Sequence, residues 1–103
     1  MDAFSVLADS TRRQILTELR RSACSVNQLV NALAISQPAM SKHLKVLRDA
    51  GFVSRRGSAQ QRIYRLEMKP LQTVDTWLSP YRRLWTRHLD ALERHLNAKE
   101  QRK

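Results

Sequence analysis

Cysteine, glycine and proline are scarce in this sequence of 103 residues, which contains one cysteine, two glycines and three prolines. A single thiol per chain forms neither an intrachain disulfide nor a thiolate cluster for zinc. Cys24 therefore indicates a reducing compartment, and we expect a cytoplasmic protein with no metal and no cofactor. Because few residues interrupt regular structure, long helices should dominate the fold.

Long hydrophobic runs are also missing. No stretch approaches the roughly 18 apolar residues that a membrane-spanning helix needs, so we predict no membrane partner. The first residues show no basic region followed by an apolar run, and we expect no signal peptide. An enzyme is not expected either, because the sequence shows no nucleophile–base pair, no paired carboxylates and no glycine-rich phosphate loop.

Positive charge is what the sequence has in excess, with a formal net charge of +10. Residues 36–66 contain seven Lys or Arg and one acidic residue, whereas residues 1–35 contain four and three. A solvated surface explains any single cationic pair. A segment that is almost purely basic is instead typical of a protein that binds a polyanion.

Three capping patterns predict helix starts after a short apolar opening around Phe4. These patterns are Asp9 or Ser10, then Ser25 with Gln28, then Ser36 with Pro38 in the first turn. The third of these helices should cover residues 36–50 and end at Gly51, since glycine readily adopts the left-handed conformation that ends a helix.

After Gly51 the hydrophobic period changes. Two β-prone runs flank the polar loop 57–61, which predicts an antiparallel hairpin over residues 52–66. Helical patterns return over residues 70–98, with a break or kink expected at Pro80. The predicted fold is a single domain over residues 1–103, mainly α with a β-hairpin wing, which is a winged helix-turn-helix.

The helix over residues 36–50 divides into two faces. Met40, Leu44 and Leu47 share one side and should face the core, and the other side is polar and cationic. A helix that enters the major groove of DNA needs this division. We therefore predict binding of double-stranded DNA, with candidate contacts from Ser36, Gln37, Pro38, Ser41, Lys42, Lys45 and, in the wing, Arg56, Ser58, Gln60 and Arg62.

Four basic residues leave two interpretations open. Arg65 suits a DNA contact or a solubilising position on an edge strand. Arg12 and Arg13 either touch phosphates or do not, and His43 is either a half-buried structural residue or a phosphate contact.

A broad apolar stripe in the C-terminal segment predicts a homodimer, because it is too wide for one side of a small monomer. The alternative is a helix folded onto its own domain. Two-fold pairing would favour a near-palindromic operator. The candidate interface residues are Phe4, Leu7, Trp77, Leu78, Tyr81, Trp85, Leu89, Leu92 and Leu96.

Three segments resemble the ArsR family of bacterial repressors. These are residues 4–16 (FSVLADSTRRQIL), residues 36–53 (SQPAMSKHLKVLRDAGFV) and residues 62–66 (RIYRL). The likeness covers roughly residues 3–68. It implies a winged-helix homodimer that pairs through its terminal helices and generally represses its own operon.

The sequence departs from the metal-sensing members of that family. Their Cys-Val-Cys corresponds to Ser25-Val26-Asn27, and neither Asp75 nor Asp90 begins the Asp-x-His of the other familiar site. A metal held across the dimer by His88 and His95 stays open, against solvent-facing or interface histidines. A metal-responsive or Cys24-based redox derepressor is the nearest alternative function, and a protein-interaction module is a third. No residue pattern indicates a small-molecule effector.

Overall fold

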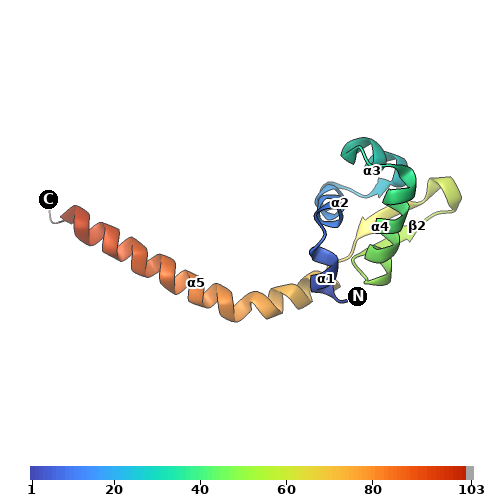
Figure 1. The fold of residues 1–103 in the computed structure, drawn as a ribbon. Helices are drawn as coiled ribbons and strands as arrows, with labels where there is room; N and C mark the ends of the chain where they lie inside the picture. Colours follow the sequence, from blue (N-terminus) through green and yellow to red (C-terminus); the bar gives the residue numbers. More distant parts are fainter. Residues whose placement is uncertain (102–103) are drawn as a thin grey trace.

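The computed structural model describes residues 1–101, without the side chains of Gln60, Glu100 and Gln101. Several short helices pack beside a small sheet, and one long helix leaves this body (Figure 1). In chain order the elements are α1 (Ala3–Leu7), α2 (Ser10–Arg21), β1 (Cys24–Ser25), α3 (Val26–Leu33), α4 (Gln37–Asp49), β2 (Val53–Arg56), the 3-10 turn η1 (Ala59–Gln61), β3 (Ile63–Leu66) and α5 (Lys69–Gln101).

Side-chain caps begin α2 and α3 where the sequence predicts them. The Asp9 carboxylate accepts a hydrogen bond from the backbone N–H of Arg12 at 3.1 Å, which makes Asp9 the cap of α2. At α3 the backbone N–H of Gln28 donates to Ser25 Oγ at 3.2 Å, and the backbone N–H of Ser25 donates to Gln28 Oε1 at 2.8 Å. Both halves of the predicted capping box are therefore confirmed.

Both ends of α4 are also formed by the predicted residues. Ser36 Oγ accepts the backbone N–H three residues ahead at 3.3 Å, and Pro38 lies in the first turn. At the other end Gly51 has a φ of +81°, and the N–H of Phe52 donates to the carbonyl of Leu47 at 2.9 Å. This six-residue closure fixes the direction in which the chain leaves α4 and enters the wing.

The sheet has three antiparallel strands in the order β1-β3-β2, one more than the predicted hairpin. In the hairpin itself Val53 lies opposite Leu66, and Arg56 lies opposite Ile63. β1 pairs with β3 on its other side. It has only two residues, which is too short for a periodic hydrophobic pattern, so sequence reasoning missed it.

The hydrophobic core lies between α2, α3, α4 and the sheet. Met40, Leu44 and Leu47 are buried, as the pattern of α4 predicts, and Phe52 is completely buried beside them. The remaining buried core residues are Val6, Ile15, Leu16, Leu19, Leu29, Val53 and Tyr64. The core thus fixes the positions of α4 and the wing relative to each other.

Arg12 and Arg13 attach α1 to α2. Arg12 Nε donates to the carbonyl of Val6 at 2.8 Å, and its Nη2 donates to that of Ser5 at 3.2 Å. Arg13 Nη1 donates to the carbonyl of Leu7 at 2.7 Å. The carbonyl of Ser5 also accepts the backbone N–H of Ala8 at 3.3 Å, so the guanidiniums mainly satisfy the last carbonyls of α1, those of Val6 and Leu7. The structure thus gives both arginines a structural role in the fold.

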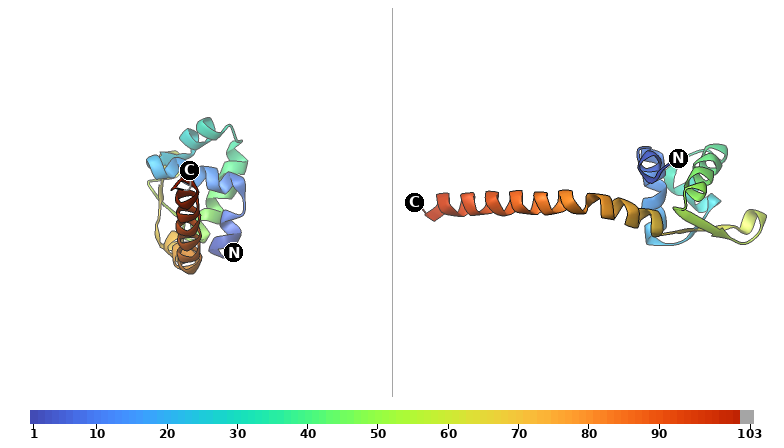
Figure 2. Two further views of the ribbon diagram at one scale, coloured as in Figure 1. Left: turned by 90° about the vertical axis from the view of Figure 1, so that its left-hand side faces the viewer. Right: turned by 90° about the horizontal axis from the view of Figure 1, so that it is seen from below.

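Helix α5 extends away from the body, and the tip of the wing lies at the opposite end of the molecule (Figure 2). The radius of gyration is 19.5 Å, against about 13 Å for a compact domain of this length. From Trp77 to Lys99 every side chain except that of Ser79 is exposed. No helix in residues 1–101 has both the length and the hydropathy to cross a membrane.

The break predicted at Pro80 is wrong, because α5 is one continuous helix with Pro80 inside it. Figure 1 shows the helix changing direction in its first half, which agrees with the alternative prediction of a kink. Arg82 donates to the Asp75 carboxylate at 2.6 Å and to the Asp75 carbonyl at 3.1 Å. These bonds bridge the segment that contains Pro80, which lacks the backbone donor of other helix residues.

Substituting Gly51 tests the turn between α4 and the wing. Gly51→Ala should lower the free energy of unfolding by about 1–2 kcal/mol, because alanine is strained at positive φ. The nearest heavy atom to the added Cβ would be Pro70 Cγ at 3.6 Å, so sterics add little. Thermal unfolding at matched protein concentration measures the loss. Gly51→Asn is the control and should lose less, since asparagine tolerates this conformation; equal losses would contradict the argument.

Candidate nucleic-acid interface

The exposed side of α4 is formed by the residues that sequence analysis assigned to DNA. Gln37, Ser41 and Lys45 follow one another at four-residue spacing and are exposed, as are Pro38 and Lys42. Ser36 is exposed too, although its hydroxyl is engaged as the cap of the helix. The polar side is therefore free of intrachain packing, while the apolar side is held in the core.

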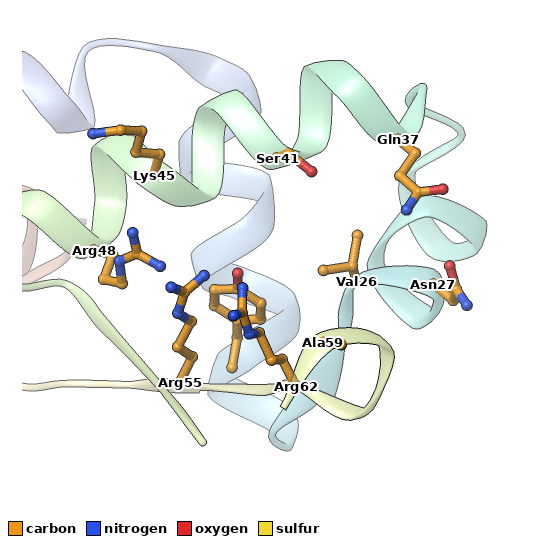
Figure 3. A pocket seen from close by; sticks show the side chains of 10 residues that line it. Val26, Asn27, Gln37, Ser41, Lys45, Arg48, Arg55, Ala59 and Arg62 are labelled. Atoms are coloured by element: carbon orange, nitrogen blue, oxygen red, sulfur yellow. The ribbon is translucent and has the colours of Figure 1, made fainter. Parts of the chain in front are cut away.

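A groove of about 660 Å³ lies between α4 and the wing (Figure 3). Gln37, Ser41, Lys45 and Arg48 line it from α4, and Arg55 and Arg62 extend into it from the wing (Figure 3). The other lining residues are Val26, Asn27, Ala59 and Tyr64. No acidic residue is among them, so the groove has the charge expected of a surface that meets a polyanion.

Sequence analysis found four of these groove residues and missed two cations. Arg48 continues the row formed by Ser41 and Lys45, so helical periodicity contained the signal for it. Arg55 could not be separated from its neighbour Arg56 by sequence alone. Successive strand residues point to opposite sides of a sheet, so only the strand register decides whether Arg55 or Arg56 points toward α4.

The predicted wing residues do not all lie in the groove. Arg56 is exposed and lies opposite Ile63, on the other face of the hairpin from Arg55. Arg65 pairs with Ser54 and shares that outer face. Ser58 is exposed at the tip. The side chain of Gln60, also a predicted contact, lies outside the described residues.

Lys45 is the one groove cation with an acidic partner among the side chains that the structure describes. Its Nζ lies 2.9 Å from Oδ2 of Asp49, one turn further along α4. The pKa of the Asp49 carboxyl is lowered, mainly by this hydrogen bond and further by the charges of Lys45 and Arg48, while desolvation opposes the shift. Asp49 is therefore ionised at neutral pH and competes with a phosphate for Lys45.

His43 lies away from the groove and is half-buried. The pKa of the Asp9 carboxyl is lowered chiefly by its hydrogen bond from the Arg12 backbone, and the charges of Arg12 and His43 add to this effect. The charge of His43 thus acts on the cap of α2, and its half-buried position agrees with the structural interpretation of this histidine.

The candidate dimer residues form a second exposed surface, on α1 and α5. Trp77 connects the two helices: its ring lies 5.3 Å from that of Phe4, edge to face, and 4.8 Å from that of Tyr81. Leu7 is half-buried and packs against the core. The remaining predicted residues are exposed along α5, namely Leu78, Trp85, Leu89, Leu92 and Leu96, together with Leu84.

Metal-ligating side chains do not gather at one place among the described residues. Across the part of the chain that the structure describes, no three His, Cys, Asp or Glu residues lie close enough to hold an ion. Cys24 is half-buried in β1, with its Sγ 3.3 Å from the carbonyl of Ser22. His88 and His95 are both exposed on α5.

Comparisons with known proteins agree on one family. The sequence model of bacterial regulatory proteins of the arsR family matches residues 9–55. The HTH-type transcriptional regulator Rv2034 of Mycobacterium tuberculosis is 40% identical over 87 residues, covering 84% of this chain and 78% of that protein. The arsenic resistance transcriptional regulator ArsR1 of Pseudomonas putida is 39% identical, covering 75% and 70%. A crystal structure of an ArsR family transcriptional regulator, RHA00566, superposes with a TM-score of 0.72 at 31% identity, covering 82% and 92%.

Removing the Asp49 charge tests whether the ion pair with Asp49 weakens the interaction of Lys45 with DNA. Asp49→Asn should tighten binding to duplex DNA roughly three-fold, because it frees Lys45 and removes a negative charge at the rim of the groove. Fluorescence anisotropy with a labelled duplex at low salt measures the change. Asp90→Asn, an equal charge change on the far part of α5, should leave affinity unaltered. Unchanged or weaker binding by Asp49→Asn would show that the ion pair does not limit Lys45.

Proposed function

This chain belongs to the arsR family of bacterial regulatory proteins, and we propose that this DNA-binding transcriptional regulator acts as a homodimeric repressor on a near-palindromic operator. The family description and the relatives named above are those of transcriptional regulators. The observation that carries the proposal is the cationic groove between α4 and the wing, lined by four basic residues and no acidic one.

Recognition of the operator is assigned to the N-terminal half of α4. Gln37 and Ser41 are exposed in the first two turns of the helix, and both line the groove. The glutamine amide can pair in bidentate fashion with adenine, and the hydroxyl can donate to or accept from any base edge. Lys42 and Lys45 are long enough to reach guanine or the flanking phosphates. Ser36 and Pro38, at the start of the helix, complete the proposed contacts on α4.

The wing is assigned to the DNA backbone beside the major groove. Arg62, the residue before β3, extends into the groove. Arg56 lies on the outer face of the hairpin and Ser58 at its tip. Phosphate contacts of this kind set the orientation of a protein on the duplex and carry no sequence information. Gln60 belongs to the same loop.

A second copy of this chain is the proposed occupant of the apolar surface on α1 and α5. Along α5 the side chains of Trp85, Leu89 and Leu92 are half or more exposed. Spacings of three and four residues place them on one side of the helix. An apolar stripe this long on an isolated helix marks an interaction site. A second copy is favoured because a two-fold dimer presents two copies of α4, which a palindromic operator requires.

Sequence preference should depend on two side chains of α4. Gln37→Ala and Ser41→Ala should each lower discrimination between the operator and random duplex by about 1–3 kcal/mol, because each removes a base contact. The operator would first be selected from a random duplex library with the parent protein. Lys42→Ala is the comparison and should weaken binding to both duplexes equally. If Gln37→Ala and Ser41→Ala both discriminate between the operator and random duplex as well as the parent protein does, the assignment is refuted.

Self-association should depend on the apolar side of α5. Trp85→Ala should raise the dimer dissociation constant on the order of 100-fold, because a buried aromatic anchor is lost twice in a symmetric interface. Sedimentation equilibrium measures the change, and operator binding should fall with it. Arg94→Ala is the control, since nine residues place Arg94 about half a helical circumference away from Trp85. Dimers as stable as the parent would contradict the proposed interface.

A further inference from the structure

Three arginines from different elements converge in the groove between α4 and the wing (Figure 3). Arg48 comes from the last turn of α4, Arg55 from β2, and Arg62 from the residue before β3. Only Arg62 belongs to the contacts assigned above. Arg48 and Arg55 have no role in the core, so their convergence needs a separate explanation.

The hairpin register brings the wing arginines to the side of α4. Arg55 lies directly opposite Tyr64 in the ladder, and Arg62 precedes Tyr64 by two residues. Residues that are opposite or two apart share one face of a sheet. Tyr64 is only 6% exposed and lines the groove between the arginines and the core. Burial of Tyr64 thus fixes the face of the hairpin that presents Arg55 and Arg62.

The charge at this convergence is unbalanced. All three arginines are half-buried, and no carboxylate within the described residues forms an ion pair with any of them. The Asp49 carboxyl, whose pKa is lowered mainly by the hydrogen bond from Lys45 and further by the charges of Lys45 and Arg48, is one negative charge against three cations and is itself paired with Lys45. Drawing cations partly out of water with so little counter-charge is unfavourable. A bound anion would supply that counter-charge, and guanidinium groups match the planar pairs of oxygens that phosphate presents.

We propose that Arg48, Arg55 and Arg62 form a clamp for a phosphodiester of the DNA backbone, which joins the wing to the recognition helix across one bound strand. This proposal rests on the DNA-binding function above and extends it to two residues with no assigned role. The groove of about 660 Å³ is larger than a single phosphate requires and also holds Gln37 and Ser41. It therefore suits a continuous strand better than an isolated ion.

The clamp would also set the register of the base contacts. Arg48 and Ser41 lie seven residues apart on α4, which is about 10 Å along the helix axis. A phosphate fixed beside Arg48 therefore determines how deeply the other end of the helix enters the major groove. Arg48 and Arg55 are positioning residues in this scheme, since they touch the backbone and no base.

Charge-neutral substitutions with a matched control test the clamp. Arg48→Gln and Arg55→Gln should each weaken binding about tenfold for the selected operator and for random duplex alike. Each should also lower the slope of log affinity against log salt by about one per subunit. Arg65→Gln removes the same charge from the outer face of the hairpin and should change both quantities less. Thermal unfolding checks that the variants are folded.

Neutralising single phosphates identifies the source of the anion. A set of operator duplexes, each with one methylphosphonate at a different position, should reveal one phosphate per half-site whose neutralisation lowers the affinity of the parent protein about as much as Arg55→Gln does. The Arg55→Gln variant should bind that duplex as tightly as it binds the unmodified operator, because the same contact is already missing. Inorganic phosphate at chloride-matched ionic strength should not compete specifically. Competition that disappears in Arg55→Gln would assign the site to a free anion and overturn the backbone clamp.

Failure of the clamp can be told apart from failure of the DNA-binding function. The clamp alone is refuted if the parent protein binds DNA in a salt-dependent way while Arg48→Gln and Arg55→Gln bind no more weakly than Arg65→Gln. The clamp is also refuted if the affinity loss caused by Arg55→Gln adds to the loss caused by every methylphosphonate, because additive losses show that Arg55 and the modified phosphate share no contact. Absence of DNA binding by the folded parent protein would instead overturn the proposed function on which the clamp rests.

Discussion

Burial of one side of α4 is the constraint on which the rest of the structure depends. Met40, Leu44 and Leu47 are fully inside the core, and each contributes about 1.5–3 kcal/mol by leaving water. The turn at Gly51 then directs Phe52 into the same core. The opposite side of α4 is left exposed, and the wing is held beside it at a fixed angle. One packing arrangement thus creates both walls of the candidate DNA surface.

The candidate DNA surface concentrates charge that favours ligand binding more than folding. Arg48, Arg55 and Arg62 face one groove without an acidic partner among the described side chains, and their mutual repulsion opposes the compact state. Lys45, by contrast, is neutralised by Asp49. A rigid core permits this unbalanced arrangement, because the positions of α4 and the hairpin do not depend on the groove cations. Binding of a polyanion then relieves a repulsion that folding leaves in place.

The proposed dimer surface is connected to the DNA-binding part through α1. Arg12 and Arg13 bind the carbonyls at the end of α1, and Phe4 on α1 packs against Trp77 on α5. A displacement of α5 would therefore act on the cap region of α2, close to His43 of α4. Val6 of α1 is buried in the core and Leu71 of α5 packs against it, so this connection also includes apolar packing.

The sequence by itself determined the features that depend on neighbours along the chain. Caps at Asp9, Ser25 and Ser36, the stop at Gly51 and the division of α4 into two sides arise within a few residues, and local rules captured them. The resemblance of residues 3–68 to known repressors also identified the family. The tertiary structure alone decided which contacts form between distant residues: β1 on the edge of β3, Arg12 on α1, Arg55 rather than Arg56 toward α4, and α5 continuing past Pro80. Register and long-range packing settle these, because they depend on distances between elements that no short-range pattern encodes.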